Sequence, residues 1–65
     1  MKAPTYVIRR PTHIYKQYEW AVMHSNGYVA WTNDPHEATE YITLSAASYD
    51  LTYIVKDRTA IVMQN

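Results

Sequence analysis

The sequence predicts an α+β domain in which one helix packs on one face of an antiparallel sheet of four to five strands, in the order β-ββ-α-ββ. Three features lead to this prediction: β-rich segments on both sides of an Asn-Gly pair, an Asp-Pro-His-Glu segment typical of a helix start, and two further β-rich segments near the C-terminus. The 65 residues suffice for one small core, so residues 1–65 are expected to form a single domain.

The N-terminal half is expected to contribute three strands. Residues 5–10 are rich in β-forming side chains and end at Pro11, which cannot donate a hydrogen bond to a neighbouring strand. Residues 18–25 and 28–33 flank the Asn-Gly pair, which favours a two-residue type I′ turn. These two segments therefore form a predicted hairpin.

The register of this hairpin determines which side chains face the core. If Ser25 lies opposite Tyr28, one face carries both tryptophans and is the expected core face, formed by Trp20, Val22, Val29 and Trp31. The other face, which no helix is expected to cover, carries Ala21, Met23, Tyr28 and Ala30. A mixed surface of tyrosine, methionine and alanine is typical of a partner-binding face.

A helix is expected to begin at Pro35 and to end near Ser48. Asp34 is suited to cap its first turn, and Pro35 tolerates the first helical position because its missing N–H needs no partner there. Glu37 completes a capping box.

The C-terminal part is expected to return to the sheet as a second hairpin. Residues 51–56 and 59–63 are both rich in β-forming side chains, and a polar segment lies between them. Its turn is predicted to be longer than that of the first hairpin.

The composition argues against several functional classes. The chain has no cysteine, which excludes disulfides and thiolate-held metal clusters, and its single glycine excludes a glycine-rich phosphate loop. No two of the three histidines have the spacing of metal ligands on one element. No segment is apolar enough for a membrane span. We therefore expect a non-enzymatic, cytoplasmic protein with no catalytic residue, metal or cofactor.

Tyrosine is unusually frequent, with seven in the chain beside two tryptophans and no phenylalanine. Recognition surfaces are enriched in tyrosine because it offers a large contact area at low entropic cost. Tyr41 and Tyr53 are expected instead to fill the half-buried sheet. The acidic residues near the helix start suit either a solvated capping surface or a patch that meets a basic partner. The candidate partner-binding residues are Tyr15, Tyr18, Met23, Tyr28, Asp34, Glu37, Glu40 and Tyr49.

An alternative function is nucleic-acid binding, because residues 9–18 interleave cations with aromatic rings. The candidate contacts are Arg9, Arg10, Tyr15, Lys16 and Tyr18. The formal net charge is zero, so counterion release would contribute little affinity, and protein binding is the preferred hypothesis. The same segment also suits an edge strand protected by arginines. A third possibility is a homodimer formed through the uncovered sheet face.

The segment from about Trp20 to Val55 contains the Asn-Gly hairpin, the helix start Asp34-Pro35-His36-Glu37-Ala38 and an expected closing strand, Tyr53-Ile54-Val55. In size and style, this segment resembles the small proteins that phages encode to disable host machinery, anti-CRISPR proteins among them. The resemblance implies a stoichiometric inhibitor that occludes a larger host protein or nucleoprotein complex in the host cytoplasm, without catalysis or cofactor. It assigns no site residue.

Overall fold

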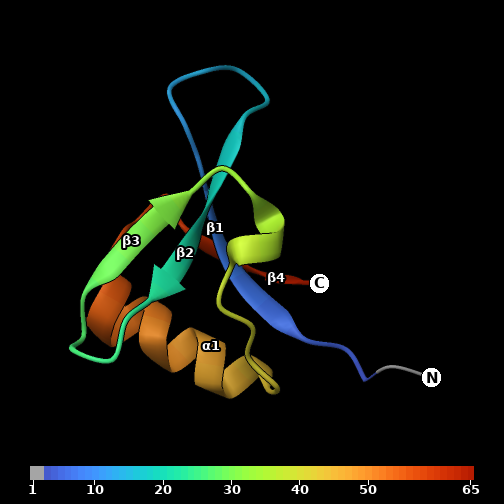
Figure 1. Ribbon diagram of the computed structural model, residues 1–65, viewed down its shortest axis with the longest axis vertical. Helices are drawn as coiled ribbons and strands as arrows, with labels where there is room; N and C mark the ends of the chain where they lie inside the picture. Colours follow the sequence, from blue (N-terminus) through green and yellow to red (C-terminus); the bar gives the residue numbers. More distant parts are fainter. Residues whose placement is uncertain (1–2) are drawn as a thin grey trace.

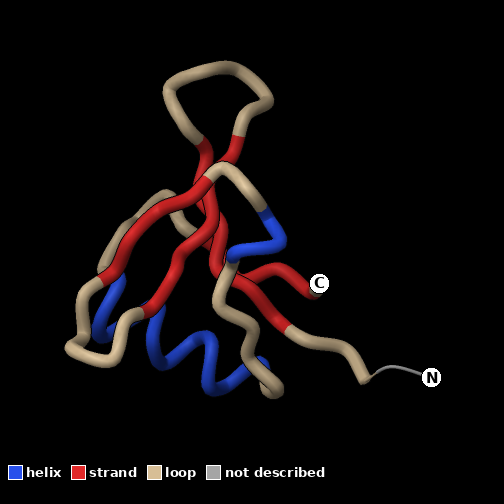
Figure 2. The backbone as a smooth tube through the Cα atoms, in the orientation of Figure 1, coloured by secondary structure: helices blue, strands red, loops and turns tan. Residues whose placement is uncertain are grey.

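The computed structural model describes residues 3–65 and contains one antiparallel sheet of four strands with one α-helix, which confirms the expected α+β class. The strand order is β3-β2-β1-β4, so β1 and β2 are interior strands (Figure 1). All helical segments lie between β3 and β4 in the chain (Figure 2). The elements are β1 Tyr6–Pro11, β2 Tyr18–Met23, β3 Val29–Thr32, the 3₁₀ turn η1 Pro35–Glu37, α1 Leu44–Asp50, the π-helix η2 Leu51–Val55 and β4 Ile61–Gln64.

The core forms where the layer of α1 and η2 packs against the interior strands. Ile8 of β1 is completely buried, and Ala21 and Ala60 are buried beside it in the same cluster. Leu51 and Val55 of η2 pack against this cluster from the helical layer. The other partly buried side chains around it are Met23, Val29, Trp31, Tyr41 and Val62.

The sheet is covered on both faces along β1, so the expected bare face does not exist there. Val7 and Ile8 are consecutive strand residues that point to opposite faces, yet they are only 4% and 0% exposed. Of the four residues expected on the bare face, Ala21 is buried, Met23 and Ala30 are half-buried, and Tyr28 is exposed. The prediction of a continuous recognition face on the sheet was therefore wrong.

A difference of one residue in the hairpin register explains this change of faces. The structure pairs Ala21 with Trp31, where the sequence predicted Val22 opposite Trp31. A shift of one residue moves every side chain of a strand to the opposite face. Ala21 and Met23 therefore join the core, and Trp20 is half-buried on the other side.

The turn between β2 and β3 is one residue longer than predicted. The Oδ1 atom of Asn26 accepts a hydrogen bond from the Tyr28 N–H at 3.0 Å, and Asn26 lacks the positive φ that a type I′ turn requires. Gly27 alone in this turn has a positive φ, of 83°. The His24 carbonyl accepts from the Gly27 N–H at 3.0 Å, and the His24 N–H donates to the Tyr28 carbonyl at 2.9 Å. Glycine thus occupies the left-handed position of a three-residue connection.

Replacing Gly27 with alanine is expected to lower the free energy of unfolding by about 1 kcal/mol, because an L-residue is strained at this positive φ. A Cβ atom at this position would have no heavy atom within 4 Å, so backbone strain is the whole effect. Urea denaturation followed by tryptophan fluorescence measures it. Ser25→Ala, in the same turn without a positive φ, is the control, and equal stability of the two variants would contradict the assignment.

The segment expected to begin a long helix forms only a single 3₁₀ turn. Asp34 caps it as predicted, since its Oδ1 accepts from the His36 N–H at 2.9 Å. Glu37 does not complete a capping box, because its carboxylate accepts instead from the Thr32 hydroxyl at 2.8 Å. The chain is extended at Ala38, and the main helix begins only after Thr43, whose Oγ1 accepts from the Ala46 N–H at 3.1 Å. The expected continuous helix from Pro35 was therefore wrong.

Residues 39–41 are extended because they bridge β1 and β2 where these strands diverge. The Thr39 N–H donates to the Ala21 carbonyl at 3.1 Å, and the Thr39 Oγ1 accepts from the Met23 N–H at 2.8 Å. Tyr41 and Tyr6 exchange two backbone hydrogen bonds of 2.8 Å. The Tyr41 hydroxyl donates to Asp50 at 2.7 Å, and burial together with this bond raises the pKa of Tyr41. These partners outweigh local helix propensity.

The segment expected as the fourth strand continues α1 as the π-helix η2. Leu51 and Val55 reach the core from it, while Tyr53 and Ile54 are exposed. Lys56 ends the π-helix with a positive φ of 55°, and its N–H donates to the Leu51 carbonyl at 3.0 Å. The prediction of a second hairpin was therefore wrong. Instead, β4 pairs with β1 in a register that sets Ile8 opposite Val62.

Candidate binding surface around the β1–β2 loop

The loop between β1 and β2 projects from the sheet at one end of the longest axis of the molecule (Figures 1 and 2). Its base is held by a hydrogen bond of 2.9 Å from the Thr12 N–H to the Gln17 carbonyl. Within it, the Gln17 N–H donates to the Ile14 carbonyl at 3.0 Å, and the Ile14 N–H donates to the Thr12 Oγ1 at 3.1 Å. Lys16 adopts a positive φ of 62°. The loop therefore has a defined conformation before any partner binds.

The tip of this loop presents apolar side chains to solvent. Tyr15 is 86% exposed and Ile14 is 48% exposed. The Lys16 ammonium lies 5.5 Å from the centroid of the Tyr15 ring. Residues 11–18 line an open depression of about 570 Å³, which we call the loop cleft. Tyr15 was predicted from the sequence and Ile14 was not, although an isolated isoleucine among polar loop residues was the available signal.

Arg9 is next to the loop cleft through Tyr18, because its guanidinium packs on the ring of Tyr18, which lines the cleft. The guanidinium carbon is 3.9 Å from the ring centroid. The register places Arg9 between Ile61 and Trp20 in a row across the sheet. Within residues 3–65, Arg9 has no carboxylate partner, and its buried Nε has no hydrogen-bond acceptor. Its positive charge is therefore uncompensated.

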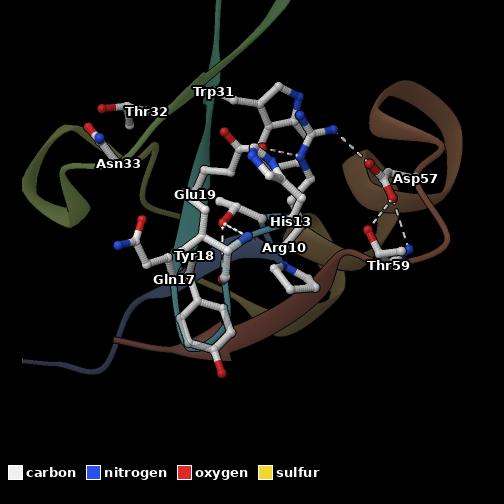
Figure 3. Close-up of a pocket in the computed structure, with 13 residues that line it drawn as sticks. Arg10, His13, Gln17, Tyr18, Glu19, Trp31, Thr32, Asn33, Asp57 and Thr59 are labelled. Atoms are coloured by element: carbon white, nitrogen blue, oxygen red, sulfur yellow. Dashed lines mark hydrogen bonds and ion pairs between the residues drawn. The ribbon is translucent and has the colours of Figure 1, made fainter.

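Arg10 points to the opposite face, because consecutive strand residues alternate. Its Nε donates to Glu19 at 2.8 Å, its Nη1 donates to Asp57 at 2.7 Å, and its guanidinium stacks 3.7 Å from the Trp31 ring centroid (Figure 3). Burial tends to lower the pKa of Arg10, but the bonds to Asp57 and Glu19 outweigh it and raise this pKa. Arg10 is therefore part of a satisfied network.

Asp57 is held in this network from both sides. The Thr59 hydroxyl and N–H donate to its Oδ1 at 2.6 and 2.8 Å (Figure 3). The bond from the Thr59 hydroxyl, followed by that from Arg10, lowers the pKa of Asp57 to about 2. An open depression of about 820 Å³ lies over Arg10 and Asp57. Because Arg10 is paired with Glu19 and Asp57, its charge is not free to bind a ligand in this depression.

The other predicted partner-binding residues are scattered over the molecule. Tyr28 is exposed at the β2–β3 turn, where its ring lies 5.7 Å from that of His24. Tyr49 is exposed on α1 and packs 4.7 Å from the ring of Tyr53. Met23 is half-buried against the core. Of the predicted set, Tyr15 and Tyr18 are brought together, since both line the loop cleft.

The predicted acidic residues do not share one helical face. Asp34 lies beside His36, with 3.3 Å between Oδ1 and Nδ1. Glu37 binds Thr32, and Glu40 accepts from the Asn65 side chain at 2.9 Å. Because the chain is extended after η1, the three carboxylates are not spaced along a helix as the sequence predicted.

Residues 3–65 contain no group of three or more His, Asp or Glu side chains that is placed to hold a metal ion. No helix in this part of the chain has the length and apolar character to cross a membrane. Comparison with protein-family models, with curated proteins and with solved structures finds no match to this chain. The geometry of the side chains is therefore the basis for inferring function.

Proposed function

We propose that this protein is a non-enzymatic binding module that docks to a larger protein through the β1–β2 loop. The observation that supports this proposal is the internally hydrogen-bonded loop that holds Ile14 and Tyr15 out in solvent. Exposed apolar side chains in a defined conformation favour binding, because little conformational entropy is lost when a partner covers them. This docking surface replaces the sheet face expected from the sequence.

The charge around the loop indicates what kind of partner it fits. Residues 11–18 contain Lys16 and His13 but no acidic residue, and Arg9 adds an uncompensated cation next to the loop cleft. An apolar pocket with an acidic rim complements this combination. We propose that the partner presents such a pocket to the loop tip.

The proposed biological role is stoichiometric inhibition. Together with the projecting loop, the resemblance to small phage-encoded inhibitors, anti-CRISPR proteins among them, supports a phage or mobile-element protein that occludes a host protein or nucleoprotein complex. It would act in the cytoplasm of the host cell. Occlusion needs a contact surface but no catalytic group, and the exposed loop tip is the proposed centre of that surface.

Binding of single-stranded nucleic acid is the second candidate. It is favoured by two cation–aromatic pairs beside the loop cleft, Arg9 on Tyr18 and Lys16 near Tyr15. The formal net charge of zero and the pairing of Arg10 with two carboxylates weaken this candidate. Fluorescence titration of a labelled oligothymidylate at two salt concentrations tests it, since phosphate contacts give a steep salt dependence.

Changing the loop tip is expected to abolish partner capture without unfolding the protein. In the double variant Ile14→Ser and Tyr15→Ala, both substituted side chains are exposed, so the free energy of unfolding should change by less than about 0.5 kcal/mol. The partner is first identified by mass spectrometry of the proteins that the wild type captures from host lysate. The purified partner should then bind the double variant at least tenfold more weakly than it binds the wild type.

Tyr53→Ala is the matched control, because Tyr53 is an exposed tyrosine of η2 outside the loop cleft. Its partner affinity should stay within about twofold of wild type. If Tyr53→Ala loses the partner and the loop variant keeps it, the docking surface is assigned wrongly. Size-exclusion chromatography with light scattering separates partner capture from formation of a homodimer.

A further inference from the structure

Both arginines of β1 stack on an aromatic ring, but within residues 3–65 only Arg10 forms ion pairs. Arg10 stacks on the Trp31 ring and is bound by two carboxylates at 2.7 and 2.8 Å. Arg9 stacks on the Tyr18 ring at 3.9 Å, and the structure of residues 3–65 gives it no carboxylate. In the described residues, Arg9 therefore has an aromatic neighbour, as Arg10 does, but no carboxylate to pair with.

The Nε donor of Arg9 is left without an acceptor in a partly desolvated place. The residue is half-buried, and its Nε is shielded from water with no acceptor in the part of the chain that is described. Its cross-strand neighbours are the half-buried Trp20 and the partly exposed Ile61, so its surroundings are apolar. An ion pair is stronger there than in bulk water, and a buried donor without a partner is unfavourable.

We propose that Arg9 is the receptor for a carboxylate of the partner, an aspartate or glutamate side chain next to the pocket that receives Ile14 and Tyr15. This inference rests on the proposed function, because the partner supplies the carboxylate. A planar guanidinium can hold one carboxylate through two parallel hydrogen bonds. Arg10 shows the same chemistry in this protein, with one hydrogen bond to each of two carboxylates. The Tyr18 ring packs on the guanidinium and is itself 37% exposed, so a partner can reach this part of the surface.

A carboxylate fits this place better than a polynucleotide does. Arg9 and Lys16 are the cations beside the loop cleft, since Arg10 is bound to Glu19 and Asp57 on the other face. Two cations release few counterions from a phosphate backbone, whereas a single arginine in apolar surroundings suffices for one carboxylate.

The first test uses the wild-type protein and needs no natural partner. In ¹⁵N-labelled protein, the Nε–H signals of Arg9 and Arg10 are followed by NMR while acetyl-Leu-Glu-Leu-amide is added at constant ionic strength. The control peptide is acetyl-Leu-Gln-Leu-amide, which has nearly the same shape without the charge. The Arg9→Lys variant identifies the Arg9 signal by its loss.

The glutamate peptide is expected to shift the Arg9 signal at least fivefold more than the glutamine peptide, and to leave the Arg10 signal unchanged. Equal shifts with both peptides would overturn the proposal. A third titration uses an oligothymidylate. If it moves the Arg9 signal and the glutamate peptide does not, Arg9 is a phosphate contact and the carboxylate assignment is wrong.

The second test measures affinity for the protein captured through the loop. Arg9→Gln is expected to weaken binding at least tenfold, and Arg9→Lys should restore part of the loss because it keeps the charge without the two-pronged geometry. Arg58→Gln is the control: Arg58 is exposed, and its substitution changes the net charge by the same amount. Its affinity should stay within twofold of wild type.

The two proposals can fail separately. If the loop-tip variant loses the partner and Arg9→Gln binds it as wild type does, the protein-binding function stands and the carboxylate receptor is refuted. If both variants bind as wild type does, the docking surface itself is wrong. Should Arg9→Gln fail to fold, the peptide titration of wild type still decides whether Arg9 receives a carboxylate.

Discussion

Replacing Ile8, the largest fully buried side chain of residues 3–65, with alanine is expected to lower the free energy of unfolding by about 3 kcal/mol. Ile8 is completely buried at the centre of the cluster that joins the sheet to η2, so its removal leaves a cavity as well as lost apolar contact. A domain of 65 residues has a total stability of roughly 3–10 kcal/mol. The variant should therefore lose between about a third and all of the stability of the domain.

Urea denaturation followed by the fluorescence of Trp20 and Trp31 measures this loss, with circular dichroism as a second probe. Ile42→Ala is the matched control, because Ile42 is 84% exposed and the same atoms are removed from a solvated place. That control should change stability by less than about 0.5 kcal/mol. Equal losses at the two positions would show that Ile8 is not the centre of the core.

Replacing Arg10 with methionine is expected to cost about 2 kcal/mol of stability, although the residue lies on the surface of the sheet. Methionine keeps the aliphatic stem against Trp31 but removes the charge that Glu19 and Asp57 share. Two partly buried carboxylates then lose their partner, which costs more than the loss of an exposed ion pair. Arg58→Met, at an exposed cation, is the control and should be nearly neutral.

The acid dependence of stability reports on the same network. The folded pKa of Asp57 is about 2, against 3.8 for an ordinary aspartate, so the ionised form stabilises the fold. This contribution is complete above about pH 5 and is lost as the pH falls from 4 towards 2. In the Arg10→Met variant the pKa of Asp57 rises only in part, because the bonds from Thr59 are retained. Urea midpoints measured from pH 7 to pH 2 should therefore show that the variant loses less stability on acidification than the wild type does. An identical loss would show that Arg10 does not lower the pKa of Asp57.

The local elements that depend on adjacent residues could be predicted from the sequence. The strand ending at Pro11, the hairpin around Gly27 and the cap at Asp34 all occur, because each depends on backbone preferences within a few residues. The turn length could not be predicted, since Asn26 can adopt either a left-handed backbone or a side-chain hydrogen bond. That single choice decides which face of β2 enters the core.

The elements that depend on distant partners were beyond local reasoning. Residues 39–41 are extended because Ala21, Met23 and Tyr6 offer them hydrogen bonds across the sheet. The β-rich segment from Leu51 is helical because Leu51 and Val55 can both reach the core from a helix that continues α1. In both cases tertiary contacts override a weak intrinsic preference.

The candidate site was predicted in its composition but not in its arrangement. The mixture of cations and aromatic rings at residues 9–18 is visible in the sequence, and Tyr15, Lys16 and Tyr18 do line one cleft. The difference between Arg9 and Arg10 was not visible, because it depends on Asp57, which is 47 residues away from Arg10 in the chain. Only the fold brings that carboxylate to Arg10 and, within residues 3–65, leaves Arg9 without an ion-pair partner.

The amino-acid sequence by itself determined the class of this protein: a small α+β domain without cysteine, in which a polar, aromatic loop follows the first strand. These properties follow from composition and from preferences within a few neighbouring residues, which act before the chain folds. The tertiary structure alone decided which sheet faces are covered, which arginine is neutralised and which apolar side chains remain in solvent. These properties depend on contacts between segments far apart in the chain, and such contacts are selected only when the whole core packs.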